Sequence, residues 1–278
     1  MSRNNHRVPK DLKFNNKLGQ HILLDEDIIA RQIGYADIEK GDTVLEIGPG
    51  TGALTFPLAE AAEKVVAIEQ DKQFYDYLRE RIPDNVELIL GDALKIELPK
   101  FDLCVSNLPY NISSPITFKL LEHDIRKAVL MYQEEFAQRM VANPGDGAYS
   151  RLSVMVYYLS RCSILENVPR TAFYPRPDVD SAIIELVPRK PPFTLESEEL
   201  FTRVVNEFFS KRRKKIRNSV ARLVERELRK RNAFSGAMQK EIIRSLPFRD
   251  ERVETLSPEQ IGQLSDILYR LLSKENRN

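Results

Sequence analysis

The tetrapeptide Asn107-Leu108-Pro109-Tyr110 has the groups needed to bind a flat ring that bears an exocyclic amine. It follows the apolar run 101–106, which is predicted to be a strand, and ligands bind at the carboxyl ends of strands in open α/β sheets. The amine of adenine is a poor nucleophile because its lone pair is delocalised into the ring. If the Asn107 side-chain oxygen and the carbonyl of Leu108 or Pro109 accept its two hydrogens, the lone pair becomes available, and Tyr110 can stack on the base. The simpler alternative is a strand-to-turn junction in which proline fixes φ.

A glycine-rich turn, Gly48-Pro-Gly-Thr-Gly52, lies between a predicted strand over 43–47 and a predicted helix over 53–59. Gly48, Gly50 and Gly52 would let a ligand approach the backbone closely. The spacing differs from the G-x-G-x-x-G of dinucleotide sites, and no Gly-Lys-Ser/Thr follows as in a P-loop. An ordinary tight turn remains the alternative for this segment alone.

Two carboxylates follow the next two predicted strands. Glu69 ends the strand over 64–69, about 20 residues past the first glycine, where an acid can accept hydrogen bonds from ribose hydroxyls. Asp92 follows the strand over 86–90 and could accept a hydrogen bond from an adenine amine. Each acid alone could be a helix-end or turn residue. Glycine turn, ribose acid and base acid in this order indicate a site for S-adenosyl-L-methionine, with S-adenosyl-L-homocysteine as the product.

Composition restricts the class of protein. The chain has 278 residues, without an apolar run long enough to span a bilayer and without a signal-peptide start, so a cytoplasmic protein with no membrane partner is expected. Cys104 and Cys162 lie in apolar segments and are expected to be reduced core residues. No Cys/His cluster has metal-ligand spacing, so no metal is expected.

Charge is unevenly distributed along the chain. The net charge of the whole chain is +1. The segment from Lys211 to Arg231 holds eleven Lys/Arg and two acids, a net charge of +9, whereas the rest of the chain has 31 basic and 39 acidic residues, a net charge of −8. This segregation predicts contact with phosphate groups of RNA. The alternative is a solvated helix face, because 216, 220 and 223 form an apolar stripe. The predicted RNA-binding residues are Lys211, Arg212, Arg213, Lys214, Lys215 and Arg217. A second basic segment, the N-terminal arm, contains Arg3, Arg7, Lys10, Lys13 and Lys17.

The order of predicted elements indicates three parts. Residues 1–16 form a basic arm, and strand and helix signals alternate over 17–188, as in a Rossmann-like α/β sheet with helices on both faces. Further strands are expected over 127–132, 163–168 and 181–187, and helices over 25–34, 71–81, 134–142 and 149–162. After a proline-rich linker, residues 189–278 are predicted to form a small all-helical RNA-binding domain, with helices over 197–231, 237–246 and 257–272.

These motifs resemble, over nearly the whole chain, those of the ribosomal RNA adenine N6-dimethyltransferases, which dimethylate two adjacent adenosines near the 3′ end of small-subunit rRNA. The resemblance implies a class I methyltransferase fold and a substrate of small-subunit rRNA or the immature small ribosomal subunit. It implies a donor-site segment at 17–24 and a second aromatic wall for the base at Phe173, in the motif 173–181. His21 stands where the family usually has Asn, and we expect donor binding to survive this change. The implied donor-binding residues are Gln20, His21, Leu23, Glu46, Gly48, Gly50, Gly52, Glu69, Asp92, Ala93 and Asn107.

Alternative functions remain open at this level. A related enzyme could methylate a large-subunit rRNA adenine, and a non-catalytic factor could use the same fold in ribosome assembly. A DNA adenine methylase would normally need a sequence-reading domain, and a small-molecule methylase would not need the concentrated basic charge. No heptad pattern indicates a coiled coil, so a monomer is expected.

Overall fold

The structure is a computed structural model that describes residues 12, 20–230 and 234–274. Its chain forms two compact units, one containing the residues up to Gln138 together with Ser160–Arg189, the other containing Arg139–Leu159 and the residues from Lys190. The sequence-based division at residue 188 stays a prediction, and the segment Arg139–Leu159 packs with the second unit. The basic residues of the N-terminal arm, Arg3, Arg7, Lys10, Lys13 and Lys17, lie outside the described residues.

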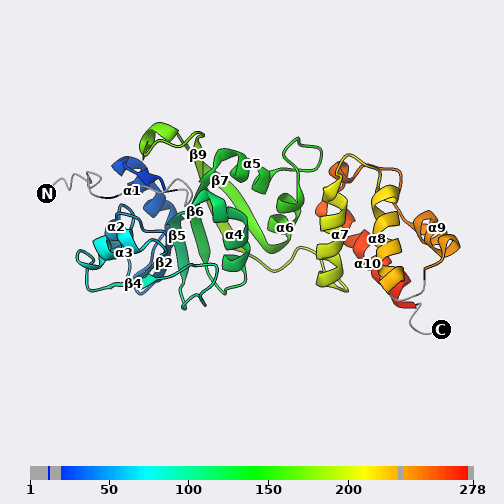
Figure 1. The fold of residues 1–278 in the computed structure, drawn as a ribbon, viewed down its shortest axis with the longest axis horizontal. Coiled ribbons are helices and arrows are strands. Elements are labelled where there is room, and N and C mark those ends of the chain that lie inside the picture. The colour runs from blue at the N-terminus through cyan, green and yellow to red at the C-terminus, as the bar shows by residue number, and fades with distance from the viewer. Residues whose placement is uncertain (1–11, 13–19, 231–233, 275–278) are drawn as a thin grey trace. The chain divides into compact units, whose positions relative to one another are not determined.

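A seven-stranded sheet organises the first unit, in the order β4-β3-β2-β5-β6-β9-β7 (Figure 1). The five strands from β4 to β6 run parallel, whereas β9 is antiparallel to both of its neighbours. The chain order reverses between β2 and β5, which is the position where open α/β sheets bind ligands. The strands are β2 (Thr43–Ile47), β3 (Lys64–Glu69), β4 (Val86–Leu90), β5 (Leu103–Asn107), β6 (Lys127–Gln133), β7 (Ser160–Val168) and β9 (Ser181–Pro188).

Helices cover both faces of this sheet. Successive strand side chains point to opposite faces, so Val65 and Ala67 pack in one hydrophobic cluster with α1 and α2, while Val66 and Ile68 are buried on the other side, where α3 packs against β3 and β4. Asp25 and Asp71 cap α1 and α3 by accepting hydrogen bonds from backbone amides. The helices are α1 (Glu26–Ala36), α2 (Thr55–Ala61), α3 (Lys72–Arg79), α4 (Ser113–Leu121) and α5 (Glu134–Val141). The expected Rossmann-like α/β class is confirmed, but α4 was not predicted.

A small additional sheet joins two distant segments. Strand β1 (Ile22–Leu23) pairs antiparallel with β8 (Phe173–Tyr174), with Ile22 opposite Tyr174. The Leu24 amide also donates a hydrogen bond to the Ala172 carbonyl at 2.8 Å. A 3-10 turn over Arg170–Ala172 precedes β8, and another over Tyr110–Ile112 follows β5. The pairing was not predicted, and it brings the start of the described chain to the motif over 173–181.

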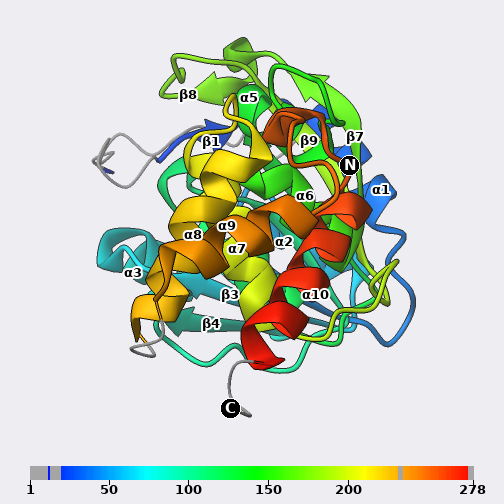
Figure 2. The same cartoon turned by 90° about the vertical axis from the view of Figure 1, so that its right-hand side faces the viewer.

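The second unit is helical and has its own core (Figure 2). Residues such as Phe201, Val220, Leu223 and Leu264 are fully buried there, so the apolar stripe expected along α8 is part of this core. The elements are α6 (Arg151–Leu159), α7 (Glu198–Ser210), α8 (Ile216–Lys230), α9 (Gly236–Ser245), a 3-10 turn over Val253–Thr255, and α10 (Pro258–Lys274).

Two helix predictions in this region were wrong in extent. The helix expected over 197–231 is interrupted at 211–215, because this segment hydrogen-bonds with residues 249–254: the Val253 amide donates to the Lys214 carbonyl at 3.2 Å, and the Ile216 amide donates to the Glu251 carbonyl at 2.9 Å. The helix expected over 149–162 ends at Leu159, because Ser160 begins β7 opposite Pro188 of β9.

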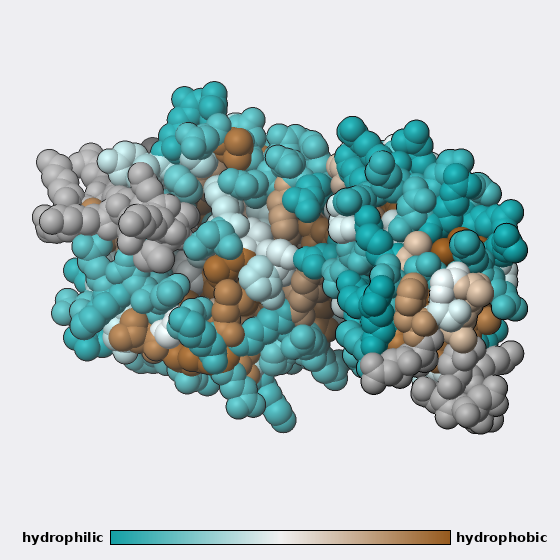
Figure 3. All heavy atoms as spheres, turned by 45° about the vertical axis from the view of Figure 1, so that its right-hand side comes forward, coloured by the Kyte–Doolittle hydropathy of each residue, from teal (hydrophilic) through white to brown (hydrophobic). Residues whose placement is uncertain are grey.

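Within the described part of the chain, no helix is long and apolar enough to cross a bilayer. The surface seen in Figure 3 is mostly hydrophilic. Cys104 is buried, Cys162 is partly buried, and both are free thiols, as expected from their apolar surroundings.

Candidate active site

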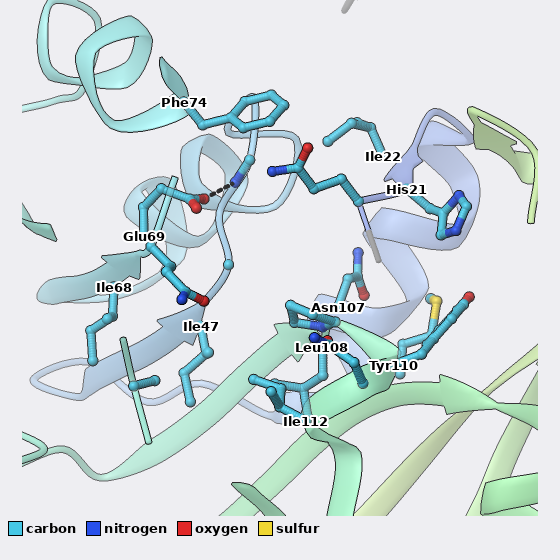
Figure 4. A pocket seen from close by; sticks show the side chains of 18 of the residues that line it. His21, Ile22, Ile47, Ile68, Glu69, Phe74, Asn107, Leu108, Tyr110 and Ile112 are labelled. Carbon is cyan, nitrogen blue, oxygen red and sulfur yellow. Dashed lines mark hydrogen bonds between the residues drawn. The ribbon is translucent and has the colours of Figure 1, made fainter. Parts of the chain in front are cut away.

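A cavity of about 860 Å³, including its open mouth, lies at the carboxyl ends of the parallel strands (Figure 4). Most of the predicted site residues line it together: Gln20, His21, Gly48, Gly50, Glu69, Asp92, Ala93, Asn107, Leu108, Pro109, Tyr110 and Phe173. Leu23, Glu46 and Gly52 were also predicted for the site, but they are not among the residues lining the cavity.

The glycine turn leaves β2 in a conformation that favours glycine. Gly48 and Gly50 have φ values of 75° and 57°. A Cβ atom at Gly50 would stand 2.7 Å from Ile22 Cδ1, which is closer than real Cβ contacts. The turn therefore needs glycine for its backbone, and the end of the Ile22 side chain packs directly against it.

Glu69 lies at the end of β3 with only 6% of its surface exposed. Its Oε2 accepts a hydrogen bond from the Gly50 amide at 3.0 Å (Figure 4). Its Oε1 accepts one from the Asp71 amide at 2.8 Å. Burial raises the pKa of this carboxyl, and the two amides oppose that shift. The acid is thus fixed against the glycine turn, inside the cavity.

Asp92 follows β4 and keeps a more exposed carboxylate. Its Oδ1 accepts a hydrogen bond from the Leu94 amide at 3.0 Å, and its Oδ2 is 3.1 Å from Lys95 Nζ. The Leu94 hydrogen bond lowers the pKa of this carboxyl, as does the lysine. Asp92 is therefore an ionised acceptor at neutral pH.

Apolar residues that were not predicted complete the walls between the two acids. Ile47 is the last residue of β2, Ile68 precedes the last residue of β3, and Phe74 is buried in α3 (Figure 4). The remaining lining residues that were missed are Ile22, Gln70, Gly91, Asn111, Ile112 and Met131. An apolar residue at the end of a strand, directly before the glycine turn or the ribose acid, is a signal that could have identified Ile47 and Ile68, although the same residue type also fills cores.

Asn107, at the end of β5, has a buried Oδ1 atom with no hydrogen-bond partner among the described residues. Buried polar atoms are nearly always paired, so this acceptor is a candidate position for a donor from a ligand or from water. Figure 4 shows the Asn107 side chain in the cavity. One N–H of an amine would match this acceptor.

Tyr110 and Phe173, the two predicted aromatic walls, both line the cavity. The Tyr110 hydroxyl lies 2.7 Å from Ser181 Oγ, and its ring lies over that of His21 with centroids 5.7 Å apart and planes at 29°. Phe173 is only 6% exposed and packs in the core of the first unit as well. Phe173 is therefore both a core residue of the first unit and part of the cavity wall.

The segment before β1 is tied to both sides of the cavity. Gln20 Nε2 donates a hydrogen bond to Asp71 Oδ2 at 2.8 Å, next to the cap of α3. His21 Nδ1 lies 2.7 Å from the Pro175 carbonyl oxygen, in the loop after β8. His21, where the resemblance expects Asn, thus connects the donor-site segment with the motif over 173–181.

The three predicted residues outside the lining have packing positions. Leu23 is buried beside Phe173 in the small sheet. Glu46 is buried, its Oε2 accepts a hydrogen bond from Thr55 Oγ1 at 2.6 Å, and burial raises its pKa to about 8. A Cβ at Gly52 would stand 2.5 Å from Phe56 Cε2 and 2.8 Å from Leu78 Cδ2, so side chains of α2 and α3 pack directly against this glycine.

The predicted RNA-binding residues differ in their surroundings. Lys211, Arg213 and Lys214 are exposed and make no ion pair with any other described residue. Arg212 instead donates hydrogen bonds to the carbonyls of Gly147 and Tyr149, at 2.7 and 2.8 Å. Lys215 and Arg217 both pair with Asp250.

No metal site accompanies the cavity. Across residues 20–230 and 234–274, no group of three or more His, Cys, Asp and Glu side chains could hold a metal ion.

The chain is similar in sequence and in structure to ribosomal RNA methyltransferases. A sequence model described as ribosomal RNA adenine dimethylase matches residues 11–253. The chain is 45% identical, over 94% of its length and 97% of the relative's, to a probable ribosomal RNA small subunit methyltransferase A from Methanosarcina acetivorans. The structure resembles a dimethyladenosine transferase from Plasmodium falciparum, with a TM-score of 0.75 and 32% identity, covering 92% of this chain and 98% of the other.

The 23S rRNA methyltransferase ErmE is also similar, with a TM-score of 0.64 and 32% identity over 89% of this chain and 99% of its own. These likenesses confirm the expected methyltransferase fold, with its seven-stranded sheet and its helical C-terminal part. The extent of the sequence match, taken with the arrangement of the cavity, shows that the chain belongs to the ribosomal RNA adenine dimethylase family.

Proposed function

We propose that this protein uses S-adenosyl-L-methionine to dimethylate the exocyclic amine of two adjacent adenosines near the 3′ end of small-subunit rRNA. The observation that carries the proposal is the buried, unpartnered Oδ1 of Asn107 in a cavity that also contains the glycine turn and Glu69. The relative from Methanosarcina acetivorans carries a small-subunit name, which supports the choice of RNA.

The residues present fit the donor. Gly48 and Gly50 leave the backbone accessible, and Glu69 offers carboxylate oxygens for ribose hydroxyls. Asp92 is an ionised acceptor for an adenine amine, and Phe74 gives an apolar wall. When bound, the donor supplies an electrophilic methyl group. The protein's part is to hold this ligand against the turn and to keep its methyl end toward the side of the cavity where Asn107 lies.

The target amine would be held by the Asn107-Leu108-Pro109-Tyr110 turn. Asn107 Oδ1 accepts one amine hydrogen and a backbone carbonyl of the turn accepts the other, which frees the nitrogen lone pair. Correct placement of two reactants can lower a barrier by about 7–11 kcal/mol. No strong base is required, because the N–H proton becomes acidic once the nitrogen carries the new methyl group, and this proton can then pass to water.

The target base must leave its stack to reach this cavity. Stacking on an aromatic side chain returns about 1–3 kcal/mol per base, and Tyr110 and Phe173 are the aromatic residues assigned to this role. For dimethylation, the monomethylated amine binds again with its methyl group turned away from Asn107.

The second unit would bind RNA through exposed cations. Lys211, Arg213 and Lys214 are assigned to phosphate contacts, because they are exposed and unpaired among the described side chains. Arg212, whose guanidinium binds two carbonyls of its own unit, is assigned to holding the loop that presents them.

Methylation of a large-subunit rRNA adenine is the second candidate, because of the likeness to ErmE. To separate the two, purified protein is incubated with labelled S-adenosyl-L-methionine and undermodified small or large ribosomal subunits, and the RNA is digested to nucleosides. Dimethyladenosine at two adjacent sites of the small-subunit RNA is the expected result. Label found only in large-subunit RNA would overturn the assignment of small-subunit rRNA as the substrate. Donor binding without methyl transfer to either RNA would overturn the proposal that the protein is an enzyme.

A further inference from the structure

The Tyr110 ring is held from two directions by side chains that lie far away in the sequence. We propose that Ser181 is a positioning residue for the transfer reaction, because its hydroxyl fixes the Tyr110 ring on which the target base stacks, while His21 supports the face of that ring. The inference rests on the proposed function, since it assigns a base to the Tyr110 ring.

Ser181 offers a rigid anchor. It is the first residue of β9, is completely buried, and its Oγ lies 2.7 Å from the Tyr110 hydroxyl. Its backbone pairs with Gln133 of β6 on one side and Val168 of β7 on the other. The backbone that carries this hydroxyl is therefore fixed, because β9 is paired with a strand on each side.

Tyr110, by contrast, begins a short 3-10 turn just after β5. Side chains on such turns are less constrained than side chains on strands that are paired on both sides. Burial raises the pKa of Tyr110, so the phenol is neutral at physiological pH and can share a hydrogen bond with Ser181. The hydrogen bond fixes the far end of the ring.

His21 fixes the ring in a second way. Its imidazole is stacked over Tyr110, and its Nδ1 lies 2.7 Å from the Pro175 carbonyl. Pro175 follows β8 in the same motif that ends at Ser181. Both supports of Tyr110 therefore depend on one segment, 173–181, which also contributes Phe173 to the cavity wall.

Ser181 is not among the residues lining the cavity, so its loss should leave donor binding unchanged. A hydrogen bond of this kind corresponds to about a 3- to 10-fold change in an equilibrium or rate constant. We expect this change in kcat, because a loosely held ring stabilises the extruded base less well, and subunit binding depends on other residues.

A double-mutant cycle tests the proposal. Ser181→Ala and Tyr110→Phe remove the hydrogen bond from its two ends, and Ser160→Ala is the matched control. Ser160 is a buried serine on β7, opposite Pro188 at the other end of β9. Transfer to small subunits and donor affinity are measured for the wild type, the three single variants and the Ser181→Ala/Tyr110→Phe double variant.

Each variant of the pair should lower kcat about 3- to 10-fold, and the double variant should lose no more than either one. The donor Kd should stay within about twofold in all of them, and Ser160→Ala should have wild-type kcat. A wild-type kcat for Ser181→Ala, or fully additive losses in the double variant, would overturn the inference. An inactive wild-type protein would instead overturn the proposed function, and with it the role of Ser181.

Discussion

Gly48 and Pro109 lie against each other across neighbouring strands, and a Cβ atom at Gly48 would be 3.4 Å from Pro109 Cδ. One residue opens the glycine turn after β2, and the other belongs to the turn after β5. The strands β2 and β5 are adjacent in the sheet, so the proposed donor site and target site share a wall. The sheet itself thus sets the distance between the two reactants.

Replacing Asn107 with alanine should reduce transfer about 10²–10³-fold, because the acceptor that polarises the amine is lost. Donor affinity should change much less than transfer, because Asn107 is only one of several implied donor-binding residues. Single-turnover transfer to small subunits and calorimetric titration of S-adenosyl-L-methionine give the two quantities. Asn107→Asp keeps an acceptor oxygen and should retain more activity than alanine; wild-type turnover in Asn107→Ala would contradict the role assigned to the amide.

Glu69→Gln should weaken donor binding about 10- to 100-fold, since hydrogen bonds to a charged acceptor contribute about 1.5–3 kcal/mol. Titration with both the donor and S-adenosyl-L-homocysteine checks this. Glu87→Gln is the control, because Glu87 is exposed on the neighbouring strand β4, where it pairs with Lys64 away from the cavity. Equal losses in the two variants would argue against a specific contact to Glu69.

Glu46 should make the donor-free protein less stable as pH rises. Burial raises its pKa from 4.5 to about 8, so between these values the unfolded state releases a proton that the folded state keeps. Glu46→Gln should therefore be more stable than the wild type at pH 8 by roughly a few kcal/mol, with a difference that shrinks toward pH 4.5.

Denaturant unfolding across this pH range measures the effect of Glu46. Glu60→Gln, an exposed position on the same helix that Thr55 begins, should show no such trend. A pH-independent difference for Glu46→Gln would mean that the carboxyl is already ionised when folded.

Changing Lys211, Arg213 and Lys214 together to alanine should weaken binding to rRNA and reduce the slope of log K against log salt by about 2–3. Filter binding over a salt series measures both quantities. Three other exposed cations, Lys40, Lys100 and Arg161, serve as the control set in the first unit. Arg212→Ala should mainly lower the melting temperature, because two carbonyls lose their donor.

Much of the sheet could be predicted because its strands are mainly apolar runs that are followed by glycine or polar residues. Strands β2, β3 and β4 have the predicted bounds, and β5 and β6 differ from them by at most two residues. Helix α4 was missed because Ser113-Ser114-Pro115 reads as a turn, although proline is tolerated in the first turn of a helix.

Features set by long-range pairing could not be predicted. Strands β1 and β8 have two residues each, too few for a periodic pattern, and they exist because each satisfies the other's backbone. The break at 211–215 consists of Lys and Arg, which are good helix formers. Its loop conformation depends on hydrogen bonds to residues 249–254, which no local signal reveals.

The site was predicted where polar residues follow successive strands in the order that a donor site needs, although each of them alone could be a helix-end or turn residue. Ile47 and Ile68 were not, since an isoleucine at a strand end is equally a core residue. The sequence gives no reason to expect different roles for Lys211 and Arg212. In the structure they differ because Arg212 donates hydrogen bonds to two backbone carbonyls.

The pairing of β1 with β8 has a consequence for biosynthesis. Residues 20–23 reach their partners only when the chain has been made as far as Tyr174, and the support of Tyr110 requires Ser181. A nascent chain that has already folded its glycine turn and its first parallel strands would still lack Phe173 and the hydrogen-bond partner of Tyr110. The proposed base-binding site is therefore complete only after the chain has been made as far as Ser181.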